Sequence, residues 1–568
     1  MQRSSPPPAR LTYFPKHAFQ ILCLVVILLG LFFRFYNLEK KVFWHDETYT
    51  AIAVSGYERG DVRRDLILSL GLNTEEILDY QSIDSDTTWE DTLGSVADEE
   101  PQNSPLYFLL SRFWVQLTQL PVALGMRSLS VAISLLAFPA TFWLCLELFQ
   151  SPQAAWLGTA LIGISPIHLL YAQEARQYSL LTVATLVASA LLLRVTRQKN
   201  LYPLLLNWCL YTALCVIGLY TQPFFLFVMV GHGIYVLFQK PFSVKHIISY
   251  SLASLFSVLV YAPWLYVILT DLEAISGWRG DTELSFSGLI GRWLLNLSRI
   301  FADFYVGDSQ NYDLVFSLTN PLLYLALGLF FLVGYSCYYL IRKTPRNVWL
   351  FVITLSVFST LFLAIADLVE GGVRSTIPRY ILPSFLGIQL AIVAVFAAKL
   401  FGKTTWKYQP VVWRGAIAFL LTLSCLSCLQ ISQASVWWSK YSNYYDTEVL
   451  ALINDSPSPA ILGHGTIRLA SLSTRLRDDA LLQLTDGKTI TRLPIPEREN
   501  IFVYDLEVYT RSIVQTIRRQ YGFDAELLYS QPLGFIHTDI QVWRVIPIRN
   551  ESLIQSFREL DANEGEGN

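Results

Sequence analysis

Long apolar runs separated by short polar segments are the dominant pattern of this sequence. Eleven such runs lie at about 18–35, 127–149, 154–172, 178–195, 201–220, 223–239, 247–270, 317–341, 347–367, 379–400 and 412–431. A helix needs about 17–25 predominantly apolar residues to cross the hydrocarbon core of a bilayer. The pattern therefore predicts a polytopic α-helical membrane protein with about 11 transmembrane helices.

Composition supports this interpretation. Of the 568 residues, 53% are hydrophobic and only 15% are charged, whereas about 25% of residues in an average soluble protein are charged. The seven cysteines all lie in apolar runs, so the sequence shows neither a disulfide framework nor a zinc cluster. A formal net charge of −3 gives no reason to expect a nucleic-acid partner. These values exclude an ordinary soluble enzyme and a small disulfide-rich scaffold.

The basic residues predict the orientation of the helices. With the N-terminus placed inside, the inner segments carry 15 Lys and Arg residues and one acid, Glu147. The outer segment 37–104 holds 16 acids and 5 bases. Inner loops are typically rich in Lys and Arg. The first run follows basic residues but lacks an Ala-x-Ala-like cleavage site, so we interpret it as a retained helix. The N-terminus is thus expected in the cytoplasm.

Two apolar stretches fit this topology only as helices on the outer surface. If 105–120 crossed the membrane, every later basic loop would lie outside. We therefore expect an amphipathic surface helix there, with Arg112 turned to the interface and Phe113 and Trp114 available to lipid. Residues 284–305 have a similar pattern. The outer loops are then 37–126 and 271–316, within a membrane domain that covers 1–431.

The last 137 residues, 432–568, have a soluble composition and are expected outside the membrane. Short apolar strands at 460–463, 501–504, 526–529 and 541–546 alternate with helix-like runs at 466–476 and 507–521. This alternation predicts a small extracytoplasmic α/β domain. The polar, acid-rich segment 73–100 of the first outer loop is expected to be mobile.

Mixed-sign charges gather at the outer ends of the predicted spans. Asp46 and Glu47 follow the first span by about ten residues. Adjacent carboxylates just outside a membrane can serve as a general base and an orienting or metal-binding partner. The alternative is an ordinary acidic loop. Neighbouring His45 is a candidate metal ligand, although a single histidine without a second one at ligand spacing is weak evidence for a metal site.

Two further outer segments carry candidate chemistry. Glu174 and Arg176 lie in a turn of a few residues between two spans, where the alternative is a pair of snorkelling helix-end charges. Arg374 and the pair Arg379-Tyr380 open the tenth span. Guanidinium groups bind phosphate well through their fork of donors, but Arg and Tyr at a span end also anchor headgroups.

These segments, in this order, resemble the GT-C superfamily of membrane glycosyltransferases. The likeness is to its family-39-like branch, which includes protein O-mannosyltransferases, aminoarabinose transferases and RgtA/B/C/D-like proteins. The matching stretches are Asp46-Glu47, Ser104-Pro105-Leu106-Tyr107-Phe108 with Met126-Arg127-Ser128-Leu129-Ser130, and Ser165-Pro166 through Tyr171-Ala172-Gln173-Glu174-Ala175-Arg176-Gln177-Tyr178. The clearest similarity covers about residues 20–240. The later spans, Arg379-Tyr380 and the outer domain fit more loosely.

The resemblance implies an inverting transfer of a sugar from a polyprenyl-phosphate carrier to a glycan, lipid or protein acceptor. Asp46 is then the candidate general base, and Glu47 would orient the acceptor or a divalent metal. Glu174, the second acid, would hold the sugar or the catalytic arginines. The implied binding residues are Arg176, Arg374 and Arg379 for the donor phosphate, and Tyr107, Tyr178, Asn103 and Ser104 for the substrates.

The sequence departs from the family at one motif. Many relatives carry His before the Pro-Leu-Tyr stretch, where this chain has Asn103-Ser104. A His/acid metal site is therefore not expected there, and Ser104 could simply cap the surface helix. Two other classes stay open, a transporter or flippase for lipid-linked saccharides and a non-catalytic scaffold. A transporter would need ionisable groups along the bundle interior or broken helices in paired halves, and the sequence shows neither. A bacterial plasma membrane is the expected location.

Overall fold

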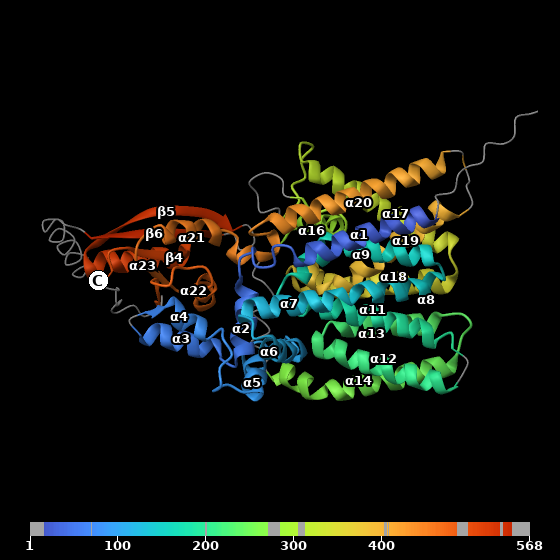
Figure 1. The fold of residues 1–568 in the computed structure, drawn as a ribbon, viewed down its shortest axis with the longest axis horizontal. Helices are drawn as coiled ribbons and strands as arrows, with labels where there is room; N and C mark the ends of the chain where they lie inside the picture. Colours follow the sequence, from blue (N-terminus) through green and yellow to red (C-terminus); the bar gives the residue numbers. More distant parts are fainter. Residues whose placement is uncertain are drawn as a thin grey trace, which may run out of the picture.

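A computed structural model describes residues 16–69, 71–198, 201–270, 284–304, 313–402, 406, 408–485, 498–533 and 538–547. A bundle of long helices forms one end of the molecule and an α/β domain the other (Figure 1). Parts of the loop expected at 271–316 lie outside the described residues.

Within the described residues, nine apolar helical segments are long enough to cross a membrane. They are α1 (Lys16–Phe35), the pair α7 (Val122–Leu135) and α8 (Ala137–Phe149), α11 (Tyr178–Val195), α12 (Leu201–Thr221), α14 (Val244–Thr270), α17 (Pro321–Lys343), α18 (Arg346–Glu370), α19 (Leu382–Phe401) and α20 (Gln409–Gln433). Each coincides with an apolar run of the sequence. The polytopic helical fold class is therefore confirmed.

Two of the eleven expected spans differ from a simple crossing helix. The run at 154–172 forms α9 (Pro152–Gly163) and α10 (Pro166–Ala172), bent by 58°. The run at 223–239 forms α13 (Phe225–Phe238), which has only 14 residues. At about 1.5 Å per residue this helix is shorter than the hydrocarbon core. By length and composition, the described residues thus contain 9 segments that could cross a membrane, or 10 if the bent pair is one span, against about 11 expected.

Buried Arg34 explains why the α9–α10 break is stable. Its guanidinium donates to the carbonyls of Gly30 at 2.9 Å, Gly163 at 2.6 Å and Ile162 at 3.3 Å. The last two carbonyls belong to the C-terminal end of α9, where a helix lacks its own donors and carries partial negative charge. Arg34 therefore caps α9 from the neighbouring α1.

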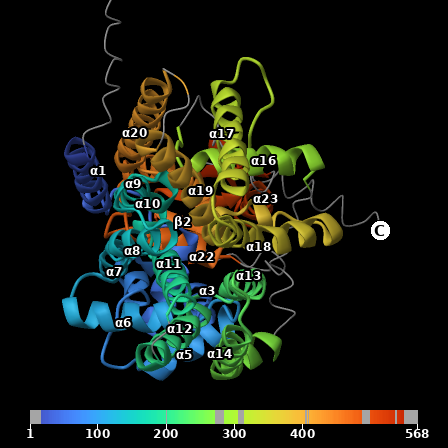
Figure 2. The ribbon, with the colours of Figure 1, turned by 90° about the vertical axis from the view of Figure 1, so that its right-hand side faces the viewer.

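Two amphipathic helices lie across the end of the bundle that faces the α/β domain. Viewed along the spans, α6 (Leu106–Thr118) and α16 (Phe286–Arg299) are seen side-on (Figure 2). Phe113 is exposed on α6, as expected. Arg112 is buried instead. Its guanidinium donates to the Val54 carbonyl and to Thr92 Oγ1, both at 3.0 Å. It therefore fastens the preceding polar loop and does not face the interface.

The C-terminal domain contains a six-stranded sheet in the order β1-β3-β2-β4-β6-β5. The strands are β1 (Leu72–Asn73), β2 (Ala460–Gly463), β3 (Leu481–Leu484), β4 (Ile501–Leu506), β5 (Phe523–Leu533) and β6 (Thr538–Pro547), accompanied by α21 (Asp446–Asn454), α22 (Thr466–Leu472) and α23 (Glu507–Tyr521). β2 is parallel to β3 and β4, whereas β6 is antiparallel to β4 and β5. All four expected strands are present.

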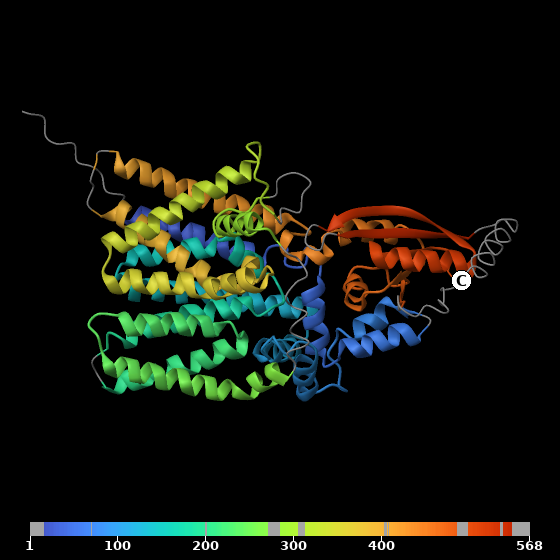
Figure 3. The same cartoon turned by 180° about the vertical axis from the view of Figure 1, so that it is seen from behind.

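The long polar loop after α1 is folded and belongs partly to this domain. It forms α2 (His45–Ser55), α3 (Arg59–Leu68), β1, α4 (Thr74–Asp79) and α5 (Trp89–Glu99). β1 pairs with β3, and Val62, Leu66 and Ile77 pack into the core of the C-terminal domain. The expectation of a mobile segment at 73–100 was wrong, because capped helices and this apolar packing hold it. Figure 3 shows the loop helices beside the α/β domain.

Candidate active site

Helix α2 lies along the boundary between the bundle and the α/β domain (Figures 1 and 3) and carries the two adjacent acids. Asp46 and Glu47 occupy its first turn, where backbone N–H groups and the helix dipole favour negative charge. The backbone N–H of His45 donates to Asn443 Oδ1 at 2.9 Å, from the 3-10 helix η4 (Trp438–Asn443) that follows α20. The start of α2, which carries these acids, is therefore held in place by η4.

Glu47 is completely buried and fully engaged by the protein. Its carboxylate accepts two hydrogen bonds from Arg127, at 2.8 and 2.7 Å, one from Lys440 Nζ at 2.6 Å and one from the Ala175 backbone N–H at 2.9 Å. Burial would raise the pKa of Glu47, but Arg127 and Lys440 outweigh it and lower the pKa to about 2. Glu47 is thus an ionised structural hub that joins α2, α7, η4 and the 173–177 turn.

Asp46 faces a different group of cations. Its Oδ2 lies 3.5 Å from Nη1 of Arg379 in η3 (Pro378–Tyr380), and neither side chain is fully buried, at 15% and 12% exposure. Burial raises the pKa of Asp46, but Arg379 and Arg176 more than offset this, so that the pKa is lowered overall. A carboxylate that is ionised and accessible can accept a proton from a substrate hydroxyl.

Arg176 connects Asp46 with a third acid, Glu100. Its Nη1 contacts Thr50 Oγ1 at 3.0 Å, the Asp46 carbonyl at 3.4 Å and Glu100 Oε2 at 3.4 Å. Asn103 Nδ2 donates to the same Glu100 oxygen at 2.6 Å. Expected substrate residue Asn103 therefore belongs to this network, and its Oδ1 accepts from Gln177 Nε2 at 3.0 Å.

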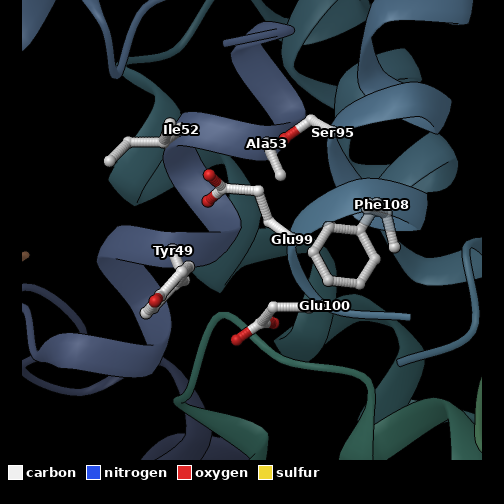
Figure 4. A pocket seen from close by; sticks show the side chains of 8 residues that line it. Tyr49, Ile52, Ala53, Ser95, Glu99, Glu100 and Phe108 are labelled. Carbon is white, nitrogen blue, oxygen red and sulfur yellow. The ribbon is translucent and has the colours of Figure 1, made fainter. Parts of the chain in front are cut away.

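A pocket lies beside the network, between α2, α5 and α6. Figure 4 shows the side chains of Tyr49, Glu99, Glu100 and Phe108 around it. Both acids are paired with arginines, Glu100 with Arg176 at 3.4 Å and Glu99 with Arg59 at 3.9 Å. Ile52, Ala53 and Val96 also line the pocket, so its wall is largely apolar apart from these two paired acids.

Glu174 lies in the same region with its carboxyl buried. Its exposed fraction is 1%, and within the described part of the chain neither side-chain oxygen has a hydrogen-bond partner. Burial, with the negative charges of Glu47 and Asp46, raises the pKa of Glu174 to about 7, against the lowering effect of Lys440 and Arg379. The three expected acids therefore differ, since Asp46 and Glu47 have lowered pKa values and are ionised at neutral pH, whereas burial favours the protonated form of Glu174.

Arg374 does not join this cluster through any contact that the structure describes. Its Nη1 contacts Glu370 at 3.2 Å and its Nε lies 3.8 Å from Asp367. The Asp367 carboxylate also accepts the backbone N–H groups of Arg374 and Ser375, at 3.0 and 2.6 Å. Arg374 thus fastens the connection between α18 and α19 and so positions the η3 turn that carries Arg379.

The expected substrate residues on and before α6 face neighbouring helices. Ser104 Oγ donates to the Leu219 carbonyl at 2.7 Å and contacts the Tyr261 hydroxyl at 3.1 Å. Tyr107 is completely buried, with its hydroxyl 2.6 Å from Ser130 Oγ. Tyr178 is also buried and packs edge-to-face on Tyr171 at 4.9 Å. A pocket lined by Tyr171, Arg379, Trp438 and Tyr441 lies next to this aromatic pair.

The residues suggested as metal ligands do not fit a metal centre well. Glu47 is neutralised by Arg127 and Lys440. Burial lowers the pKa of His45 to about 4, so its ring is neutral, and it packs edge-to-face on Tyr49 at 5.1 Å. In the described ranges no group of three or more His, Cys, Asp or Glu side chains could hold a metal ion.

The sequence did not predict two residues of the site, Lys440 and Glu100. Lys440 is 393 positions from Glu47, and Glu100 was one acid among many in its loop. The only sequence signal for Lys440 was a single basic residue inside the aromatic stretch 437–445.

Comparisons with known protein families and with curated proteins find no match. Among solved structures, the chain is similar to ArnT from Cupriavidus metallidurans bound to undecaprenyl phosphate, with 12% identity over 93% of this chain and 98% of that one and a TM-score of 0.50. The apo state of ArnT gives 11% identity, the same coverage and a TM-score of 0.49.

A second similarity is to the oligosaccharyltransferase AglB from Archaeoglobus fulgidus in complex with an inhibitory peptide and a dolichol-phosphate. It has 12% identity over 82% of this chain and a TM-score of 0.43, and the chain spans only 65% of AglB. The ArnT likeness, over nearly the full length of both chains, shows that the protein has the GT-C-like fold expected from its sequence.

Proposed function

We propose that the protein is an inverting membrane glycosyltransferase that uses a polyprenyl-phosphate-linked sugar on the extracytoplasmic face. The observation that carries the proposal is the pairing of Asp46 with Arg379, 3.5 Å apart, where the helical bundle meets the α/β domain. The pair combines an ionised, partly exposed base with a cation suited to phosphate. The fold shared with a structure that contains undecaprenyl phosphate supports this choice of donor class.

The proposed reaction is a single displacement. Asp46 removes the proton from the acceptor hydroxyl as that oxygen forms a bond to the anomeric carbon of the sugar. The bond between this carbon and the phosphate oxygen breaks, and the electron pair leaves with the carrier phosphate. Arg379 and Arg176 stabilise the charge that develops there. Arg374 acts as a positioning residue, since Asp367 and Glu370 already engage it.

The experiment compares wild type with Asp46→Asn in detergent or nanodiscs, using a panel of polyprenyl-phosphate hexoses and pentoses. We expect sugar transfer or donor hydrolysis in wild type and a loss of about 10²–10⁴-fold in the variant. Asp98→Asn, on an exposed position of the same loop, is the matched control and should keep full activity. Full activity of Asp46→Asn would refute the assignment. An absence of turnover with every donor would favour a transporter or a scaffold.

A further inference from the structure

Glu174 presents a chemical problem that the reaction scheme leaves open. Its carboxyl is 1% exposed, and both oxygens lack hydrogen-bond partners within the described residues. Buried polar groups in proteins are nearly always hydrogen-bonded, and an unsatisfied one costs free energy of about 1–3 kcal/mol. A group of this kind beside a candidate active site is a place where a ligand can supply the missing partner.

The turn that carries Glu174 is held on both sides. Gln173 Nε2 donates to the carbonyls of Phe33 and Tyr36 at 2.9 and 3.0 Å, and Lys41 Nζ donates to Gln173 Oε1 at 3.0 Å. On the other side, the Ala175 backbone N–H donates to Glu47 at 2.9 Å. Because both neighbours are fixed, the Glu174 side chain is directed inward by the fold.

The cations around Glu174 already pair with the other two carboxylates, Asp46 and Glu47. The charged or titratable groups that act on Glu174 are Asp46 and Glu47 from α2, Arg127 from α7, Tyr178 from α11, Arg379 from η3 and Lys440 from η4. Arg127 and Lys440 hydrogen-bond Glu47, and Arg379 pairs with Asp46. A third carboxylate charge, at Glu174, would lack a cation of its own and would repel an anionic phosphate.

We infer that Glu174 is protonated in the working enzyme and donates a hydrogen bond to a non-bridging oxygen of the carrier-lipid phosphate. This inference rests on the proposed function and names the chemistry by which its donor is held. A neutral carboxyl keeps one O–H donor. When this donor binds a phosphate oxygen, the buried group is satisfied, and the phosphate gains a short hydrogen bond in addition to those from the arginines. The pKa of about 7 lets the donor form persist up to neutral pH.

The test is a pair of variants, Glu174→Gln and Glu174→Ala, probed with undecaprenyl phosphate at about pH 6 and about pH 8.5. Glutamine keeps an uncharged donor at all pH values, so Glu174→Gln should bind within about threefold of wild type at the lower pH and more tightly at the higher pH. Glu174→Ala should bind at least about tenfold more weakly at the lower pH. Because the phosphate also titrates near pH 6, the ratio of wild type to Glu174→Gln is the informative quantity.

A second readout reports protonation without any ligand. Wild type minus Glu174→Gln infrared difference spectra should contain a protonated-carboxyl band at about pH 6 that disappears at about pH 8.5. Glu147→Gln, at a site paired with Arg194 at 3.8 Å, is the matched control. This variant still contains Glu174, so its own spectrum should keep the protonated-carboxyl band. Absence of the band, or a tenfold loss of binding in Glu174→Gln at the lower pH, would overturn the inference. If wild type shows the band but binds no polyprenyl phosphate, both the proposed donor and the role of Glu174 are wrong.

Discussion

Lys440, at the start of the C-terminal domain, lies 2.6 Å from Glu47, in the loop after the first span. Both side chains are at most 2% exposed, so the pair is inaccessible to solvent. Glu47 also holds Arg127 and the Ala175 backbone N–H. This one carboxylate therefore ties the C-terminal domain to the segment that carries Asp46, and its partners form a single cooperative unit.

Removal of the Lys440 charge should destabilise the protein. In Lys440→Met, Glu47 keeps Arg127 but loses a buried ionic partner, and breaking such a pair costs about 3–5 kcal/mol. We expect a lower midpoint of thermal unfolding. The double variant Lys440→Met/Glu47→Gln should lose more stability, because buried Arg127 then lacks its carboxylate partner as well. Lys343→Met, on an exposed residue at the end of α17, should leave the midpoint unchanged. Equal losses in Lys343→Met and Lys440→Met would contradict the structural role of the pair.

The charge of Arg379 should determine the acid limb of the pH–activity profile. Because Arg379 keeps the pKa of Asp46 low, the base is ionised throughout the neutral range. In Arg379→Gln, burial of Asp46 is less compensated, so its pKa rises and the acid limb of kcat/KM moves to higher pH. The donor KM should also rise. Arg346→Gln, at an exposed position opening α18, serves as control. An unchanged acid limb in Arg379→Gln would show that Asp46 is not the titrating base.

Much of the fold was readable from the sequence because hydrophobic periodicity is a local signal. The helix expected at 507–521 coincides with α23, and the strand at 460–463 with β2. The prediction of a mobile segment at 73–100 was wrong because an acidic composition does not prevent capped helices from forming. Local signals were present, since Asn73 with Glu76 and Thr88 with Asp91 form capping boxes that open α4 and α5. The pairing of Leu72 with Leu482 joins segments about 400 residues apart, which no local pattern reveals.

The candidate site was predictable only in part, for a similar reason. Asp46, Arg176 and Arg379 were singled out separately, and the structure brings them into contact. The sequence could not separate the two adjacent acids by role, because that depends on Arg127 and Lys440, which reach Glu47 and not Asp46. It also placed Arg374 with Arg379, whereas Asp367 and Glu370 at the end of α18 hold Arg374 apart.

Arg374 and Arg379 should therefore respond differently to the same substitution. The Arg374–Glu370 pair is partly exposed, with Glu370 at 53%, so its loss costs only about 0–1 kcal/mol. Arg374→Gln should lower kcat/KM by less than about tenfold, through poorer positioning of η3. Arg379→Gln, which removes a group proposed to face the phosphate, should lower it by about 10²-fold or more. Steady-state kinetics on one donor would decide this, and equal losses would place Arg374 at the phosphate as well.

The packing of α1 against α9 should depend on the absence of a side chain at Gly30. A Cβ there would clash with the Gly163 carbonyl oxygen, which Arg34 also binds. Gly30→Ala should therefore push the helices apart and weaken the cap on α9, at a cost of about 1–3 kcal/mol. Gly334→Ala is the matched control, because nothing lies within 4 Å of a Cβ at that position of α17. Alanine favours a helix over glycine by about 1 kcal/mol, so the control should be neutral or stabilising. Thermal unfolding followed by circular dichroism measures both. If Gly30→Ala unfolds at the same temperature as Gly334→Ala, then the Arg34 cap and the α1–α9 contact do not set the stability of the bundle.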